Sequence, residues 1–188
     1  VLAQQVFGGH GYIWETGVEQ AVRDARIAMI YEGANGVQAM DLVGRKLPAN
    51  GGRSIQAFFK LIGEEVALGK AEPETAAVAE ALEKANQQLQ AATMWLMQNA
   101  MTNPNNAGAA SYAYMHIMGI VAVGMMWLKM ARAAQAQIAA GVGNTTYLNA
   151  KIVTARFFAE RMMPDAGALR RKIEGGSESL MALAPEAF

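Results

Sequence analysis

The 188-residue sequence contains no cysteine. Disulfide bridges, thiolate nucleophiles and zinc sites built on cysteine are therefore excluded. The same lack fits a protein of the reducing cytoplasm, which is the location we expect. Histidine is nearly as scarce, and neither His10 nor His116 has a partner at metal-ligand spacing. We therefore expect no metal site.

An excess of charge of either sign is also missing, because 16 Lys and Arg residues balance 16 Asp and Glu residues. Without a basic patch, we expect no nucleic-acid partner. Strand patterns are weak along the whole chain, whereas alanine is abundant and apolar residues recur at helical spacing. This pattern predicts an all-α fold, a helical bundle, in a chain long enough for one good core or two small ones.

Glycine and proline divide the chain most clearly at residues 48–52 (PANGG), where we place a boundary between residues 1–47 and residues 53–188. Before this break, helices are expected over 15–30 and 35–47. The chain opens on Val1, no signal peptide is visible, and residues 1–6 resemble the end of a helix. We therefore expect a C-terminal fragment of a longer protein.

After the break, helical patterns cover residues 53–69, 73–101, 107–140, 145–163 and 165–173, and the tail 175–188 has little pattern. We expect Pro73 to open the helix 73–101. We expect Thr145 or Thr146 to cap the helix 145–163. One helix carries apolar residues at alternating spacings of about four and three, which predicts a packing seam. These residues are Val78, Leu82, Ala85, Leu89, Ala92 and Leu96.

No Asp, Glu, Lys or Arg occurs between Lys84 and Lys129, and residues 107–128 are long enough to cross a bilayer. Polar residues precede and interrupt this segment, so we expect a buried central helix and no membrane span. Eight methionines cluster here, and we expect them to fill gaps in the core. They are Met94, Met97, Met101, Met115, Met118, Met125, Met126 and Met130.

Glu32 is the most informative single residue, because it stands before Gly33 at the junction of two predicted helices. A carboxylate at such a junction is held in place and can serve as a base. The same residue could instead favour the start of the following helix through its charge. The local residues alone leave both interpretations open.

Taken together, the first 47 residues resemble the C-terminal signature of the acyl-CoA dehydrogenase family. The resemblance is carried by residues 5–12 (QVFGGHGY), by 23–26 (RDAR) and by 30–33 (IYEG). The continuation 35–47 (NGVQAMDLVGRKL) and the later segment 154–161 (TARFFAER) are similar to a subgroup. That subgroup includes 3-methylmercaptopropionyl-CoA dehydrogenase and has a long helical C-terminal extension.

The resemblance implies a role for each matching residue. Glu32 would remove the α-proton of an acyl-CoA thioester, while FAD takes the β-hydrogen as hydride, giving a trans-2-enoyl-CoA. Gly33 would leave room for the substrate. The residues matching positions near FAD are Gln5, Gly8, Gly9, Ala34, Asn35 and Gly36. Ala34 departs from the family, which usually has threonine there, so one hydrogen bond to the cofactor would be lost.

The resemblance also implies electron-transferring flavoprotein as the electron acceptor and a homodimeric parent protein. The family's flavin site needs an N-terminal helical domain and a β domain as well, so we expect the isolated chain to be inactive. Two alternatives stay open: an acyl-CoA oxidase-like enzyme that reduces oxygen directly, and a non-catalytic helical assembly module.

Overall fold

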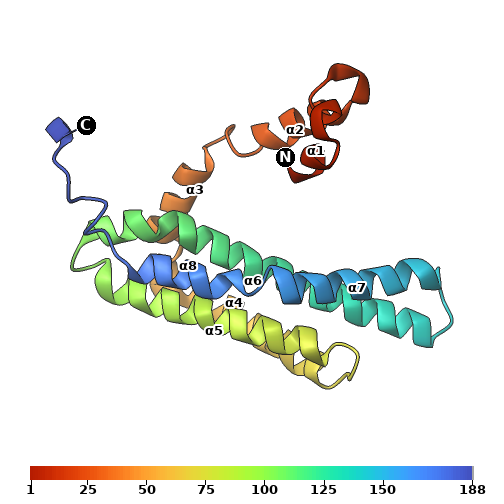
Figure 1. Cartoon of the computed structure of the whole chain (residues 1–188). Helices are drawn as coiled ribbons and strands as arrows, with labels where there is room; N and C mark the ends of the chain where they lie inside the picture. Colours follow the sequence, from red (N-terminus) through yellow and green to blue (C-terminus); the bar gives the residue numbers. More distant parts are fainter. Residues whose placement is uncertain (188) are drawn as a thin grey trace. The chain divides into compact units, whose positions relative to one another are not determined.

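The computed structural model describes residues 1–187, and all regular structure within them is helical (Figure 1). This confirms the all-α fold class expected from the apolar spacing. The chain forms two compact units, residues 1–38 and the residues from Ala39 onward. The division falls inside helix α3 (Asn35–Asp41).

The first unit is built from short elements: α1 (Leu2–Val6), 3₁₀ turns at Gly8–Gly11 and Trp14–Thr16, and α2 (Val18–Ile27). The helix expected over 15–30 is shorter at both ends, because Gly17 adopts a left-handed φ of 76° and single turns replace the helix after Ile27. Gly11 is the one buried residue of this unit. With its apolar side chains exposed, the unit has no hydrophobic core of its own.

The second unit begins with the end of α3, which continues as a π-helical segment (Leu42–Lys46) and a 3₁₀ turn (Ala49–Gly52). Asn50 and Gly51 adopt left-handed conformations there, with φ values of 55° and 65°. The break expected at 48–52 is therefore a sharp turn of the backbone, as the Asn-Gly-Gly sequence favours.

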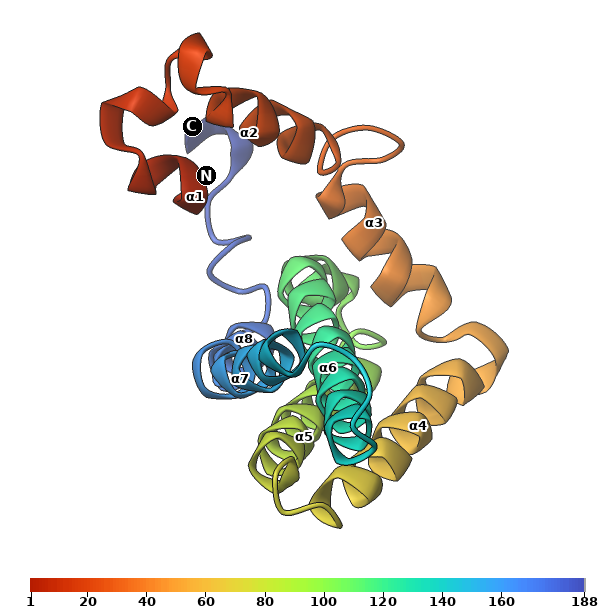
Figure 2. The same ribbon diagram turned by 90° about the vertical axis from the view of Figure 1, so that its right-hand side faces the viewer.

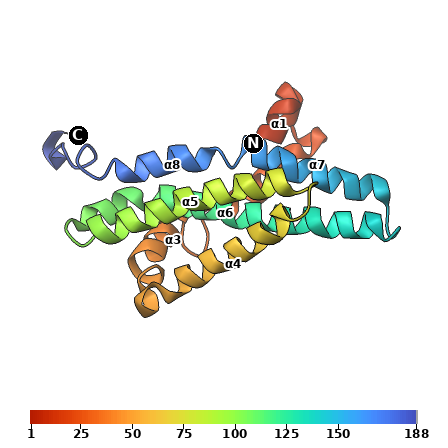
Figure 3. The same cartoon turned by 90° about the horizontal axis from the view of Figure 1, so that it is seen from below.

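Five helices then form the bundle: α4 (Arg53–Lys70), α5 (Ala76–Asn99), α6 (Pro104–Ala139), α7 (Thr145–Arg161) and α8 (Asp165–Glu174). Helices α5, α6 and α7 lie side by side (Figure 1), and α4 and α8 also contact both α5 and α6. The end-on view of Figure 2 places α4 on one side of the α5–α6 pair and α7 with α8 on the other. Figure 3 shows that α8 follows α7 nearly in line, so these two helices together cover the length of the pair.

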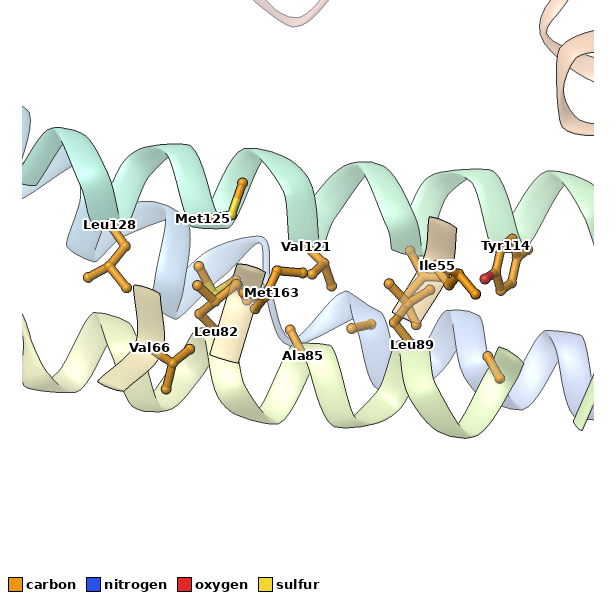
Figure 4. Close-up of a cluster of buried hydrophobic side chains, with 14 of the residues drawn as sticks. Ile55, Val66, Leu82, Ala85, Leu89, Tyr114, Val121, Met125, Leu128 and Met163 are labelled. Atoms are coloured by element: carbon orange, nitrogen blue, oxygen red, sulfur yellow. The ribbon is translucent and has the colours of Figure 1, made fainter. Parts of the chain in front are cut away.

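The core confirms the predicted packing seam of α5. All six of its residues are buried, and they face apolar residues of α4, α6 and the α7–α8 junction (Figure 4). The helices approach closely where glycine replaces a larger residue: a Cβ on Gly69 would lie 2.8 Å from Leu128 Cδ1 and 3.0 Å from Ala79 Cβ. Interlocking of this kind is typical of well-packed helix pairs.

Helix α6 is long and apolar enough to cross a membrane by length and composition. Its inner face is nevertheless part of the bundle core, with Tyr114, Ile117, Val121 and Leu128 fully buried. The Tyr114 hydroxyl pairs with Thr93 Oγ1 at 2.8 Å, which satisfies both polar groups inside the core. The expectation of a central helix is therefore confirmed.

The methionine prediction was largely wrong. Met125 is buried, whereas five of the eight are exposed, namely Met94, Met97, Met101, Met126 and Met130. The inward positions of α5 and α6 are mostly taken by Leu, Ile, Val, Ala and Tyr, so four of the exposed methionines fall on outer helix faces, and Met101 lies in the turn after α5.

Three helix ends also differ from expectation. Pro73 lies in the turn before α5, which begins at Ala76, and α6 begins at Pro104, before the expected start at residue 107. The N-cap of α7 is Asn144 and not Thr145 or Thr146. Its side-chain Oδ1 accepts a hydrogen bond from the Tyr147 N–H at 3.1 Å. Asparagine is among the best N-cap residues, so this outcome follows the general preference.

Candidate active site

Glu32 lies in the loop that joins α2 to α3, and its backbone conformation is unusual. Its φ is 53°, which makes it one of two non-glycine residues with a positive φ among the described residues 1–187. A side chain in the left-handed region costs roughly 1–2 kcal/mol, because Cβ approaches the following carbonyl oxygen. Such residues persist only where surrounding contacts hold them, and they gather at functional sites.

Two hydrogen bonds close the loop around Glu32. The backbone N–H of Asn35 donates to the carbonyl of Met29 at 3.1 Å. The side-chain Nε2 of Gln38 donates to the carbonyl of Glu32, also at 3.1 Å. Gly33 continues the left-handed turn with a φ of 95°. The carboxylate of Glu32 is exposed and forms no ion pair within the described part of the chain.

The charged run before the loop is engaged in local contacts along α2. Arg23 forms an ion pair with Glu19 at 2.8 Å, and Asp24 accepts a hydrogen bond from Gln20 at 2.7 Å. Arg26 Nη1 reaches the sulfur of Met29 at 3.3 Å, which is the start of the loop. These contacts leave Glu32 without a cationic neighbour on its own loop.

The residues matching FAD-contacting positions lie in two separate places. Gln5, Gly8 and Gly9 belong to α1 and the turn that follows it, whereas Ala34, Asn35 and Gly36 begin α3. No hydrogen bond or ion pair between described residues joins the two groups.

Both groups leave the backbone accessible. A Cβ added at Gly8, Gly9 or Gly36 would meet no atom within 4 Å, and Gly8 has a φ of 57°. The side chain of Gln5 is exposed, as is Ala34. These open glycines fit a large cofactor that must approach the backbone closely. The residues present therefore leave room for such a cofactor at both places.

The sequence did not single out two residues that hold these loops together. Gly11 is packed so tightly against α1 that a Cβ would lie 2.3 Å from the Gln4 carbonyl oxygen, and Gln4 Nε2 donates to its carbonyl at 3.1 Å. Gln38, in the first turn of α3, donates a side-chain hydrogen bond to the Glu32 carbonyl. A side-chain contact to a backbone carbonyl six or seven residues away has no signal in sequence spacing.

Four surface clefts of about 340 to 680 Å³ lie in the second unit, and none is lined by Glu32 or by another residue of 1–38. Among the described residues, no group of three or more His, Cys, Asp or Glu side chains could hold a metal ion.

Comparison with known proteins places both parts of the chain in one family. Residues 1–47 match the model of the acyl-CoA dehydrogenase C-terminal domain. Residues 54–184 match the model described as acetyl-CoA dehydrogenase C-terminal like.

Individual relatives agree with these matches. The chain is 38% identical over 181 residues to 3-methylmercaptopropionyl-CoA dehydrogenase of Ruegeria pomeroyi, covering 96% of this chain and 31% of the relative. It is 30% identical over 194 residues to the broad-specificity linear acyl-CoA dehydrogenase FadE5 of Mycobacterium tuberculosis, covering 98% of this chain and 31% of the relative. A short-chain-specific acyl-CoA dehydrogenase of Megasphaera elsdenii is 55% identical over 38 residues, which are 20% of this chain and 10% of the relative.

The chain thus spans 31% of the length of the Ruegeria pomeroyi and Mycobacterium tuberculosis relatives. Its all-α fold, its two matched segments and these relatives agree. The chain belongs to the acyl-CoA dehydrogenase family as a C-terminal portion, and within that family it resembles the group of 3-methylmercaptopropionyl-CoA dehydrogenase.

Proposed function

We propose that this chain is the C-terminal part of an FAD-dependent acyl-CoA dehydrogenase, in which Glu32 removes the α-proton of the acyl thioester. The observation that carries the proposal is the backbone of Glu32 itself. A glutamate is held at a positive φ of 53° in a loop closed by two hydrogen bonds, in a family of oxidoreductases. A residue that only favoured the start of a helix would need no such conformation.

The chemistry explains why a carboxylate is needed at this position. A thioester α-proton is a weak acid, so the base must be positioned and water must be excluded. A Glu32 carboxylate oxygen takes the proton as the Cα–H bond breaks, and the released electron pair forms the Cα=Cβ bond of the trans-2-enoyl-CoA. Bound FAD supplies the oxidant that receives the β-hydrogen with its electron pair.

The backbone around the base has a role as well. The N–H of Glu32 would donate to the thioester carbonyl oxygen, which becomes more negative as the α-proton leaves. Gly33 has no side chain and so would leave room beside the acyl chain. Gln5, Gly8 and Gly9 at one loop, and Ala34, Asn35 and Gly36 at the other, would hold FAD, mostly through their accessible backbone.

The rest of the chain would have a structural role. We propose two domains, residues 1–47 and residues 53–188, and support comes from the two separate family matches. Most of the buried core belongs to the second domain, to which Val43 and Leu47 of the first domain are added, so the second domain would be a helical bundle that extends the catalytic protein. The assembled protein would be a cytoplasmic homodimer.

Replacing Glu32 with Gln in the complete flavin-loaded protein tests the proposal. The amide keeps the size of the side chain and cannot accept a proton, so turnover of acyl-CoA should fall by roughly 10² to 10⁴-fold. Glu74→Gln is the matched control, because Glu74 is exposed and forms no ion pair within the described residues. Unchanged turnover in Glu32→Gln would support the non-catalytic module instead.

The electron acceptor is tested separately. Electron-transferring flavoprotein should be reduced by the acyl-CoA-treated protein, with little hydrogen peroxide formed in air. Stoichiometric peroxide would favour the oxidase-like alternative and would leave the role of Glu32 intact.

A further inference from the structure

Gln38 lies in the first turn of α3, six residues after Glu32, and its side chain points back along the chain. Its Nε2 donates a hydrogen bond to the Glu32 carbonyl oxygen at 3.1 Å. Its own backbone N–H donates to the Ala34 carbonyl at 3.1 Å, so the residue is anchored in the helix from which it reaches. The first turn of α3 is thereby connected to the loop that carries the carboxylate.

Gly33 is the residue that lets this contact form. A Cβ at Gly33 would lie 2.7 Å from Gln38 Nε2, which is closer than real Cβ contacts come. The amide of Gln38 therefore occupies the space that a side chain at position 33 would need. Glu32, Gly33 and Gln38 form one interlocked unit, which depends on glycine both for its φ of 95° and for this space.

The hydrogen bond acts on the torsion angle that matters most for the base. Holding the Glu32 carbonyl fixes the peptide plane between Glu32 and Gly33, and so it fixes ψ of Glu32. With φ in the left-handed region, ψ then decides how the Glu32 side chain and N–H are directed relative to the following helix. Without the hydrogen bond from Gln38, Glu32 is free to relax towards the more common regions of φ and ψ.

We propose that Gln38 is a positioning residue for Glu32, which holds the base and its N–H in the conformation that reacts. The inference rests on the proposed function of Glu32. Gln38 does not take part in proton transfer, and its effect is transmitted through the backbone of Glu32.

The test compares variants in the complete flavin-loaded protein. Gln38→Met keeps the length and the helix propensity of the side chain but removes the donor. Gln38→Glu keeps its shape and offers only an acceptor to the carbonyl. Gln87→Met on α5 is the control, because Gln87 is exposed and makes no side-chain hydrogen bond within the described residues. Each protein is assayed with butyryl-CoA and palmitoyl-CoA for kcat, KM, flavin content and thermal midpoint.

A positioning role predicts that kcat falls about five- to tenfold in both Gln38 variants, the effect of losing one hydrogen bond that holds a catalytic group. KM, flavin content and the thermal midpoint should stay at the wild-type values. Substrate deuterated at the α-carbon should show a larger isotope effect on kcat than in the wild type, because proton removal becomes slower. Gln87→Met should match the wild type in every measurement.

Three results would overturn the inference: wild-type kcat in both variants, an unchanged isotope effect, or a loss of flavin or folded protein that accounts for the whole loss of activity. Glu32→Gln, assayed alongside, distinguishes a failure of the role proposed for Gln38 from a failure of the role proposed for Glu32. If Glu32→Gln is inactive while Gln38→Met is fully active, only the role of Gln38 fails. If Glu32→Gln keeps wild-type turnover, the proposed function fails first.

Discussion

Replacing Arg132 should expose how much the bundle depends on one buried ion pair. Arg132 of α6 donates from Nη1 to Glu65 of α4 at 2.7 Å, and from Nε to Glu72 in the α4–α5 turn at 2.9 Å. The Glu65 side chain is only 7% exposed, whereas that of Arg132 is 23% exposed. The hydrogen bond to Glu65 is the largest cause that raises the pKa of the Arg132 guanidinium, so Arg132 keeps its positive charge.

The expected loss of unfolding free energy in Arg132→Met follows from the unpaired carboxylate of Glu65 that the substitution leaves in the bundle. Breaking a buried ion pair typically costs 3–5 kcal/mol, because the remaining charge has no partner. Since Arg132 is partly exposed and methionine retains the packing of its stem, we expect about 2–3 kcal/mol. Arg156→Met on α7 is the control: its pair with Glu160 is 4.0 Å long, both side chains are mostly exposed, and its loss should cost less than about 0.5 kcal/mol.

Urea unfolding of the 188-residue chain, followed by circular dichroism, measures both costs. The double variant Glu65→Leu with Arg132→Met should regain a large part of the loss, because no charge is then left buried. If Arg132→Met is as stable as the control, or if the double variant loses the sum of both single costs, the pair does not act as described.

Three other measurements follow from the structure. Burial raises the pKa of Tyr114 to about 12, so stability should be unaffected below pH 10 and then fall between pH 10 and 12, as the unfolded tyrosine loses its proton first. The loss of stability is about 2–3 kcal/mol at pH 12. Tyr114→Phe should remove this part of the alkaline decline. An identical decline in the variant would contradict the role given to Tyr114. Asn144→Ala removes the cap of α7 and should cost about 1 kcal/mol in urea unfolding, whereas Thr145→Ala should cost little; equal costs would refute the assignment of the cap. The purified 188-residue chain should show no visible flavin absorbance and no acyl-CoA oxidation, since it spans 31% of its relatives; a yellow, active chain would show that these residues suffice.

Much of the bundle could be predicted from the sequence because helix packing depends on periodicity. The apolar spacing of α5 predicted which residues are buried, and the glycines and proline of residues 48–52 marked the break before α4. The methionines were misplaced because periodicity shows that a face is apolar without showing whether another helix covers it. Met94 is apolar like Leu89, but it lies on an exposed face of α5, and Met101 lies in the exposed turn after that helix.

The candidate site was less predictable than the bundle. Sequence resemblance identified Glu32 and Gly33, but it gave no indication that Glu32 adopts a positive φ. The hydrogen bond from Gln38 to the Glu32 carbonyl depends on the direction of a flexible side chain, which spacing alone does not determine. The tight packing of Gly11 against Gln4 is likewise a matter of distance between backbones.

The most direct test of the account is the rate at which acyl-CoA reduces the bound flavin of the complete protein in a single turnover without oxygen. Glu32→Gln should slow this step by roughly 10² to 10⁴-fold while flavin content stays unchanged, because no carboxylate is left to take the α-proton. Flavin reduction at the wild-type rate in Glu32→Gln would contradict the assignment of Glu32 as the base.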